Sequence, residues 1–70
     1  MQEIIINQVS VYRAKIGVTQ EDLASNVGVS RQTIIALEKG NYTPSILLAL
    51  KITRFFKVPV EKIFTLSYEK

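Results

Sequence analysis

Cysteine and histidine are both absent from the 70 residues of the sequence. Without them the chain has no disulfides, thiolate nucleophiles, imidazole bases or common zinc sites, and the lack of cysteine fits an intracellular protein. No apolar run approaches the roughly 18 residues of a membrane-spanning helix. The N-terminus lacks the positive flank and long apolar stretch of a signal peptide. These absences predict a cytoplasmic protein with no membrane partner, metal or other cofactor.

Patterns of catalytic residues are missing as well. The sequence contains no phosphate-binding loop and no metal-ligand spacing. Glu21 and Asp22 are adjacent carboxylates, but they fall at a predicted helix start, where negative charge suits the helix dipole. Acid–base catalysis would instead need carboxylates that converge in a pocket. We therefore expect a protein that is not an enzyme.

Apolar residues, in contrast, are plentiful: they make up 47% of a chain whose net charge is +3. This basic charge is compatible with nucleic-acid binding, although many proteins are equally basic. A chain of this length forms a single domain, 1–70, with a small core. Because the apolar content exceeds what such a core hides, we expect a subunit interface to bury the excess.

Hydrophobic periodicity and capping residues predict five helices, at about 8–16, 20–26, 31–39, 44–56 and 59–64. The predicted N-caps of the first four are Asn7, Thr19, Ser30 and Thr43. Pro44 then occupies the first position of the fourth helix, where its missing N–H costs nothing. The chain ends predict two strands, because residues 3–6 are a β-branched run and residues 64–68 alternate apolar and polar. Neither strand has another partner, so we expect them to pair.

Residues 20–39 carry the most informative pattern, two helices that meet across a short turn. Ala24 is small where the helices cross, and Gly28 permits a positive φ at the turn. The apolar residues that would clamp the two helices are Leu23, Val27, Val29, Ile34 and Leu37. This arrangement predicts a helix-turn-helix motif over 20–39.

A helical wheel separates two faces of the segment 31–39. Ile34 and Leu37 point inward with Ser30. The outward face and its flank hold Arg31, Gln32, Ile35, Ala36 and Lys39. Arginine pairs with guanine and glutamine with adenine through two hydrogen bonds each. The segment is therefore predicted to be a recognition helix that enters the DNA major groove.

The ordered set of motifs resembles the Cro/C1-type (XRE) helix-turn-helix family of phage and bacterial repressors over roughly residues 9–64. The segments that carry the resemblance are TQEDLA at 19–24, GVSRQTI at 28–34, LEKG at 37–40, PS at 44–45, LALKI at 48–52 and VEKIF at 60–64. The resemblance implies an all-α, five-helix, lambda-repressor-like DNA-binding domain. Short cytolysin-type repressors extend this fold with an antiparallel two-stranded sheet from the chain ends, which the two predicted strands match.

The resemblance also implies a function, a sequence-specific transcriptional regulator that represses by binding an inverted-repeat operator in double-stranded DNA as a homodimer. By position it assigns base reading to Ser30, Arg31, Gln32 and Ala36. It assigns phosphate contact to Gln20, Thr33, Lys39, Asn41 and Tyr42, although packing of Tyr42 within its loop is an equal alternative. Arg13 and Glu38 match a structural ion pair. Lys57 departs from the family, because many members end the fourth helix there with glycine.

Two questions stay open from the sequence. The fifth helix and tail offer a dimer interface through Val60, Ile63 and Leu66, but packing at the edge of the core is nearly as good an interpretation. The same fold also serves antitoxins and other protein-interaction modules. A toxin or another regulatory protein is therefore an alternative partner, and a purely structural role is a third interpretation.

Overall fold

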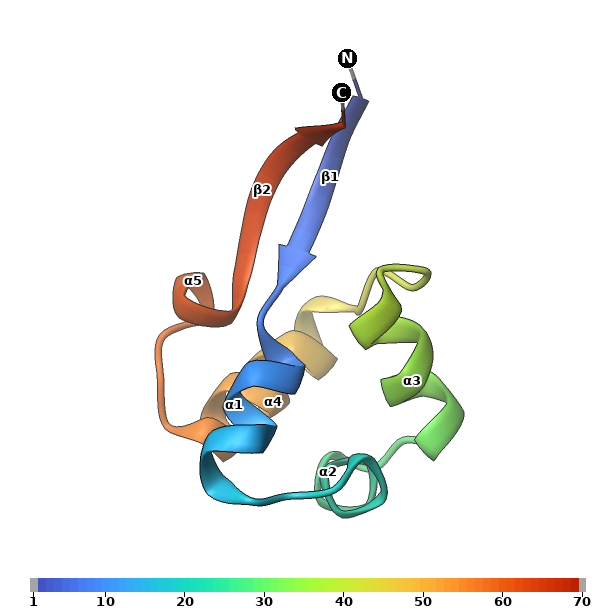
Figure 1. Cartoon of the computed structure of the whole chain (residues 1–70), viewed down its shortest axis with the longest axis vertical. Coiled ribbons are helices and arrows are strands. Elements are labelled where there is room, and N and C mark those ends of the chain that lie inside the picture. The colour runs from blue at the N-terminus through green and yellow to red at the C-terminus, as the bar shows by residue number, and fades with distance from the viewer. Residues whose placement is uncertain (1, 70) are drawn as a thin grey trace.

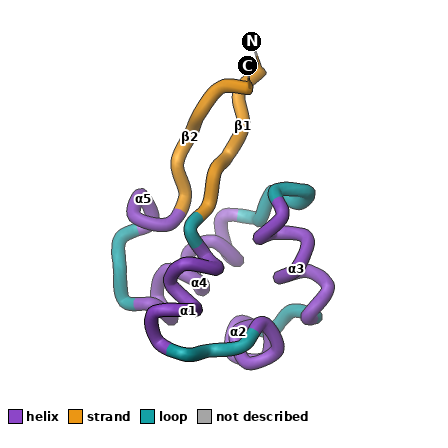
Figure 2. The backbone as a smooth tube through the Cα atoms, in the orientation of Figure 1, coloured by secondary structure: helices purple, strands orange, loops and turns teal. Residues whose placement is uncertain are grey.

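Residues 2–69 of the computed structural model form five helices and a two-stranded sheet (Figure 1). In chain order the elements are β1 (Gln2–Asn7), α1 (Val9–Ile16), α2 (Gln20–Val27), α3 (Arg31–Lys39), α4 (Ile46–Phe56), α5 (Val60–Ile63) and β2 (Phe64–Glu69). The helices gather into one body, and the strands extend from it side by side (Figure 2). The predicted antiparallel pairing of the two terminal strands is confirmed, and this sheet makes the predicted class label, all-α, incomplete.

The turn between α2 and α3 is shaped by its end residues. Gly28 ends α2 with a φ of 76°, the left-handed conformation that its sequence position predicted. Ser30 then caps α3, because its hydroxyl accepts the N–H of Thr33 at 3.2 Å.

Lys57 ends α4 with a φ of 60°, so a residue with a Cβ occupies the conformation that glycine usually takes.

Three predicted helix starts and two predicted helix ends differ from the structure by one or two residues. The first helix begins at Val9 instead of residue 8, and the second ends at Val27 instead of residue 26. The fourth helix begins at Ile46, not Pro44, because the hydroxyl of Ser45 accepts the N–H of Leu48 at 3.1 Å and Pro44 fits the non-helical segment before it. The fifth helix begins at Val60, with Pro59 as its N-cap. It ends at Ile63 instead of residue 64, because Phe64 is already extended as the first residue of β2.

The core lies where the five helices meet. Its buried apolar side chains are those of Val9, Leu23, Ala24, Val27, Ile34, Leu37, Leu48, Ile52, Phe56 and Ile63. Leu23, Val27, Ile34 and Leu37 therefore clamp α2 and α3 as predicted, with Val29 partly buried against them. None of the helices in 2–69 is both long and apolar enough to span a membrane.

We call β1 and β2 together the terminal ribbon. Its strands pair antiparallel, with Gln2 opposite Glu69 at the tip and Asn7 opposite Phe64 at the base. Within the ribbon, Ile5 pairs with Leu66. These two side chains remain 43% and 62% exposed. The ribbon thus carries apolar surface that the helical body does not cover.

Candidate nucleic-acid interface

The N-terminus of α2 is fixed by a reciprocal pair of hydrogen bonds. The hydroxyl of Thr19 accepts the N–H of Asp22 at 3.0 Å, and the carboxylate of Asp22 accepts the N–H of Thr19 at 3.4 Å. This capping box holds the first turn of the helix in a single geometry. The carboxylate of Asp22 is occupied with helix stabilisation, which is the role that the sequence favoured over catalysis.

The first turn of α3 presents the predicted base-reading side chains to solvent. Ser30, Arg31 and Gln32 are exposed, whereas Ala36, one turn later, is half-buried. The opposite face of the helix is buried through Ile34 and Leu37. Because these two anchor α3 against the core, the polar side chains of its first turn must point outward.

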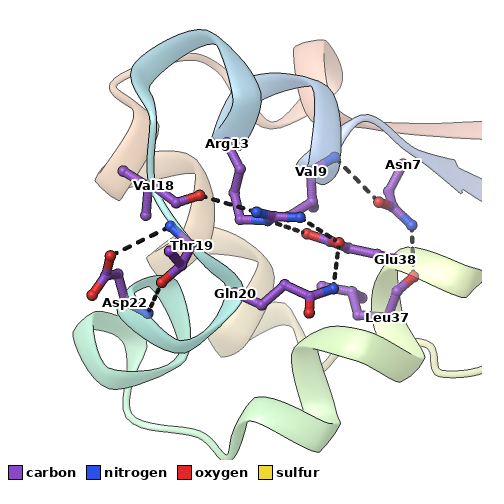
Figure 3. A network of polar contacts seen from close by, with 9 residues as sticks. All are labelled: Asn7, Val9, Arg13, Val18, Thr19, Gln20, Asp22, Leu37 and Glu38. Carbon is purple, nitrogen blue, oxygen red and sulfur yellow. Dashed lines mark hydrogen bonds and ion pairs between the residues drawn. The ribbon is translucent and has the colours of Figure 1, made fainter.

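A polar network behind α3 joins three helices (Figure 3). The guanidinium of Arg13 on α1 donates from Nε to Glu38 Oε2 at 2.6 Å and from Nη2 to Glu38 Oε1 at 3.0 Å. Its Nη1 also donates to the carbonyl of Val18 at 3.0 Å. The predicted ion pair is present, and its two-pronged geometry fixes the position of α3 relative to α1.

The ion pair is largely shielded from water, since 18% of the Arg13 side chain and 8% of the Glu38 side chain are exposed. Burial by itself would raise the pKa of Glu38, but the hydrogen bonds from Arg13 and Gln20 outweigh it and lower that pKa. The hydrogen bond to Glu38 raises the pKa of Arg13. Both groups are therefore charged at neutral pH.

Gln20 is the third member of this network. Its side-chain amide Nε2 donates to Glu38 Oε1 at 3.0 Å, a contact that the predicted phosphate role did not include. An amide nitrogen carries two hydrogens, so one stays available for a second acceptor. Gln20 also lines an open hollow of about 800 Å³ with Arg13, Thr19 and Arg31. The hollow joins the start of α2 to the start of α3.

The remaining predicted phosphate residues lie on and just after α3. Thr33 is half-buried, and its hydroxyl lies 3.0 Å from that of Ser30. Lys39, Asn41 and Tyr42 are exposed. The N–H of Asn41 donates to the carbonyl of Ala36 at 2.9 Å, which folds the chain back against the last turn of α3. Lys39, Asn41 and Tyr42 thus flank the exposed face of α3 at the end opposite the hollow, whereas Thr33 lies in the first turn.

The structure corrects one residue of the predicted dimer interface. Ile63 is fully buried in the core of its own chain, because the single turn of α5 points this side chain into the helical body. Val60 and Leu66 are exposed, by 40% and 62%. Ile63 is therefore a core residue, and the dimer role of Val60 and Leu66 stays a prediction. Sequence reasoning also missed the 80% exposure of Ile46 at the start of α4.

Asn7 has a contact that the sequence did not reveal. It was predicted as the N-cap of α1, and its Oδ1 does accept the N–H of Val9, at 3.2 Å, although Gln8 occupies the cap position. Its Nδ2 donates to the carbonyl of Leu37 on α3 at 2.8 Å. Thirty residues separate these partners. Local sequence patterns give no signal for such a pairing.

The sequence of the chain is similar to those of known helix-turn-helix proteins. The helix-turn-helix family model matches residues 11–63. An HTH-type transcriptional regulator of Methanocaldococcus jannaschii is 60% identical over 58 residues, which cover 83% of this chain and 88% of that protein. A cryptic phage CTXphi transcriptional repressor of Vibrio cholerae, RstR, is 31% identical over 51 residues, which cover 73% of this chain and 46% of that protein.

The fold also matches a solved structure. The transcriptional regulator VanUg superposes with a TM-score of 0.80 and 20% identity, over 99% of this chain and 92% of that one. At this identity the likeness concerns the fold alone. The family model and the 60% identical relative assign the chain to the Cro/C1-type helix-turn-helix family, whose members are transcription regulators and not enzymes. The chain is a DNA-binding transcriptional regulator.

Proposed function

We propose that the protein is a repressor that binds an inverted-repeat operator as a homodimer, with α3 of each subunit in a major groove. The observation that carries this proposal is the two-faced character of α3. Arg31 and Gln32 are exposed on its first turn, while Ile34 and Leu37 are buried behind them. Recognition helices place their N-terminal residues against base edges, where arginine and glutamine read guanine and adenine.

Phosphate contacts on both sides of α3 would set its register on the duplex. The start of α2, with the amide of Gln20, lies beside one end of the exposed face. Lys39, Asn41 and Tyr42 lie beyond the other end. Residues 20–39 contain two basic and three acidic residues, and Arg13 neutralises one of the acidic ones, Glu38. Recognition therefore depends on directed hydrogen bonds and dimer geometry more than on a strong positive field.

Exposed apolar surface supports association of two chains. Leu66 pairs with Ile5 across the terminal ribbon, and both side chains are exposed, as is Val60 at the start of α5. A two-fold dimer through this side would present two copies of α3 to successive turns of DNA, with centres about 34 Å apart. The similar Vibrio cholerae protein is named a repressor, which supports repression by occlusion of a promoter.

Selection of bound sequences from a random DNA pool tests this function. The expected product is an inverted repeat with half-site centres about one helical turn apart. The protein should sediment with about twice the 7.9 kDa mass of one chain. Selection of unrelated sequences would contradict sequence-specific binding, and a single-chain mass at micromolar concentration would contradict the homodimer. Stoichiometric association with a different protein would favour the antitoxin alternative.

The assigned roles are separated by two variants. Gln32→Ala should weaken binding to the selected site by about 1–3 kcal/mol and relax one base preference, because it removes a base contact. Gln20→Ala should weaken binding to all DNA sequences similarly and leave the ranking of their affinities unchanged, because phosphates carry no sequence information. Equal losses on the selected and random DNA for Gln32→Ala would refute its base-reading role. An altered ranking for Gln20→Ala would refute its phosphate role.

A further inference from the structure

Asn7 connects the terminal ribbon to the recognition helix. It is the last residue of β1 and lies opposite Phe64, the first residue of β2. From this position its Nδ2 donates to the carbonyl of Leu37 in the last turn of α3, at 2.8 Å (Figure 3). Among the hydrogen bonds that residues 2–69 form, this is the one that joins the ribbon to α3. A single side chain therefore bridges two elements that are distant in sequence.

The amide of Asn7 is held at both of its ends. Its Oδ1 accepts the N–H of Val9 at 3.2 Å, which fixes the amide plane at the start of α1. The carbonyl of Leu37 also accepts the N–H of Gly40 at 3.0 Å, so both of its lone pairs are used. Next to Asn7, the N–H of Gln8 donates to the carbonyl of Ile63 at 2.8 Å. The ribbon base is thus tied to α1, α3 and α5 within two residues.

This bridge matters because the ribbon and α3 have different tasks in the proposed dimer. The ribbon side would contact the second subunit through Leu66 and its neighbours, while α3 would contact DNA. In a two-fold dimer, the separation and relative direction of the two α3 helices depend on the angle between the dimer contact and α3. An added base pair between half-sites moves one of them by about 3.4 Å and turns it by about 35°. A fixed angle therefore selects one spacing.

We propose that Asn7 is a positioning residue that holds α3 at a set angle to the terminal ribbon and so determines the half-site spacing that the dimer accepts. The inference rests on the proposed function, a dimer on an inverted repeat. It goes beyond that function because it assigns the choice of spacing to a residue outside the proposed DNA and dimer contacts. Recognition of the half-site sequence is still assigned to Arg31 and Gln32.

The two hydrogen bonds of Asn7 can be separated by substitution. Asn7→Asp keeps an oxygen for the N–H of Val9 but loses the donor to Leu37. Asn7→Ser likewise keeps a short acceptor for the N–H of Val9. It adds no charge, whereas Asn7→Asp places a carboxylate in a second hollow, which Asn7 and Lys39 both line. Thr65→Val is the matched control, because its hydroxyl donates to the carbonyl of Ile6 within the ribbon, at 3.5 Å, and does not reach α3.

The experiment measures the affinity of the full chain for a single half-site and for inverted repeats whose spacing varies by one base pair at a time. The wild type should bind its best spacing about tenfold more tightly than the next, a difference of the size of one lost base contact. Asn7→Asp and Asn7→Ser should reduce this preference to about threefold or less, with half-site affinity within about twofold of wild type. Thr65→Val should keep the wild-type profile.

The outcomes distinguish failure of the proposed dimer from failure of the role of Asn7. A wild type without a preferred spacing would overturn the dimer on an inverted repeat, and the role of Asn7 with it. A wild type with a preferred spacing that both variants retain would overturn the role of Asn7 alone. A uniform loss at every spacing and on the half-site would also overturn it, because it would mark a merely structural residue. If Asn7→Asp does not fold, Asn7→Ser decides the outcome.

Discussion

In the helical body, Leu23, Ile34 and Leu37 expose at most 1% of their surface, whereas in the terminal ribbon Ile5 and Leu66 expose 43% and 62%. Both regions are rich in aliphatic residues, so composition does not distinguish them. The body buries its apolar side chains within one chain, and burial of this kind stabilises the fold. The ribbon leaves its apolar side chains uncovered, which suits contact with another molecule. Substitutions in the two regions should therefore have different consequences.

The largest expected effect on the free energy of unfolding comes from a substitution in the helical body. Leu37→Ala should lower the free energy of unfolding by about 3–4 kcal/mol, because it leaves a cavity between α3 and the core. Urea denaturation followed by circular dichroism measures this loss. Ile34→Val, a smaller change on the same face, should cost only about 1 kcal/mol. A loss below that of Ile34→Val would mean that the core repacks freely around α3.

The next largest effect on the free energy of unfolding is expected from a substitution in the ion pair behind α3. Glu38→Gln is expected to cost about 2–3 kcal/mol near neutral pH, because it leaves the shielded charge of Arg13 without its partner. The pKa of Glu38 is lowered by folding, so its contribution is complete above its ordinary value of 4.5 and is lost as the pH falls through the folded-state pKa. Urea titrations at several pH values check both statements. Glu61→Gln, an exposed residue of α5, is the control and should cost little.

A stabilising change is expected at the end of α4. Lys57 has a φ of 60°, which is unfavourable for a residue with a Cβ. Lys57→Gly should raise the free energy of unfolding by about 0.5–1 kcal/mol. Lys57→Ala removes the same charge but keeps the Cβ, so it should bring no gain. Equal stabilisation by both variants would attribute the effect to the charge instead of the backbone.

The smallest effect on stability is expected in the ribbon. Leu66→Ser should change the free energy of unfolding of the body by about 0.5 kcal/mol or less, because the side chain makes mainly a cross-strand contact. It should instead abolish the proposed dimer, so the unfolding midpoint would lose its dependence on protein concentration. Sedimentation before and after the substitution measures the mass directly. A loss as large as that of Leu37→Ala would make the ribbon part of the core and remove the distinction between the two regions.

Local signals in the sequence located most of the body correctly. Thr19, Ser30 and Gly28 act through neighbours one to four residues away, so their roles follow from spacing alone. The start of α4 was misplaced because Thr43–Pro44 and Ser45 offer competing start signals, and the Ser45 hydrogen bond to Leu48 decides between them.

Contacts between residues that are far apart in the chain could not be predicted from local sequence patterns. The burial of Ile63 depends on how one turn of α5 docks on the body, and one turn is too short to show a periodicity. The bond from Asn7 to Leu37 depends on the ribbon base meeting the end of α3. The amide of Gln20 was assigned to phosphate by resemblance, yet it also donates to Glu38, which only three-dimensional packing brings within reach.

The closed ends of α3 have a thermodynamic consequence. Ser30 satisfies an N–H of its first turn, Gly40 and Asn7 satisfy carbonyls of its last turn, and Glu38 in the same last turn ties the helix to α1. The helix is therefore complete before any DNA arrives, and association need not order its backbone. The heat-capacity change on binding should match the apolar surface buried at the interface, without the larger negative contribution that accompanies coupled folding.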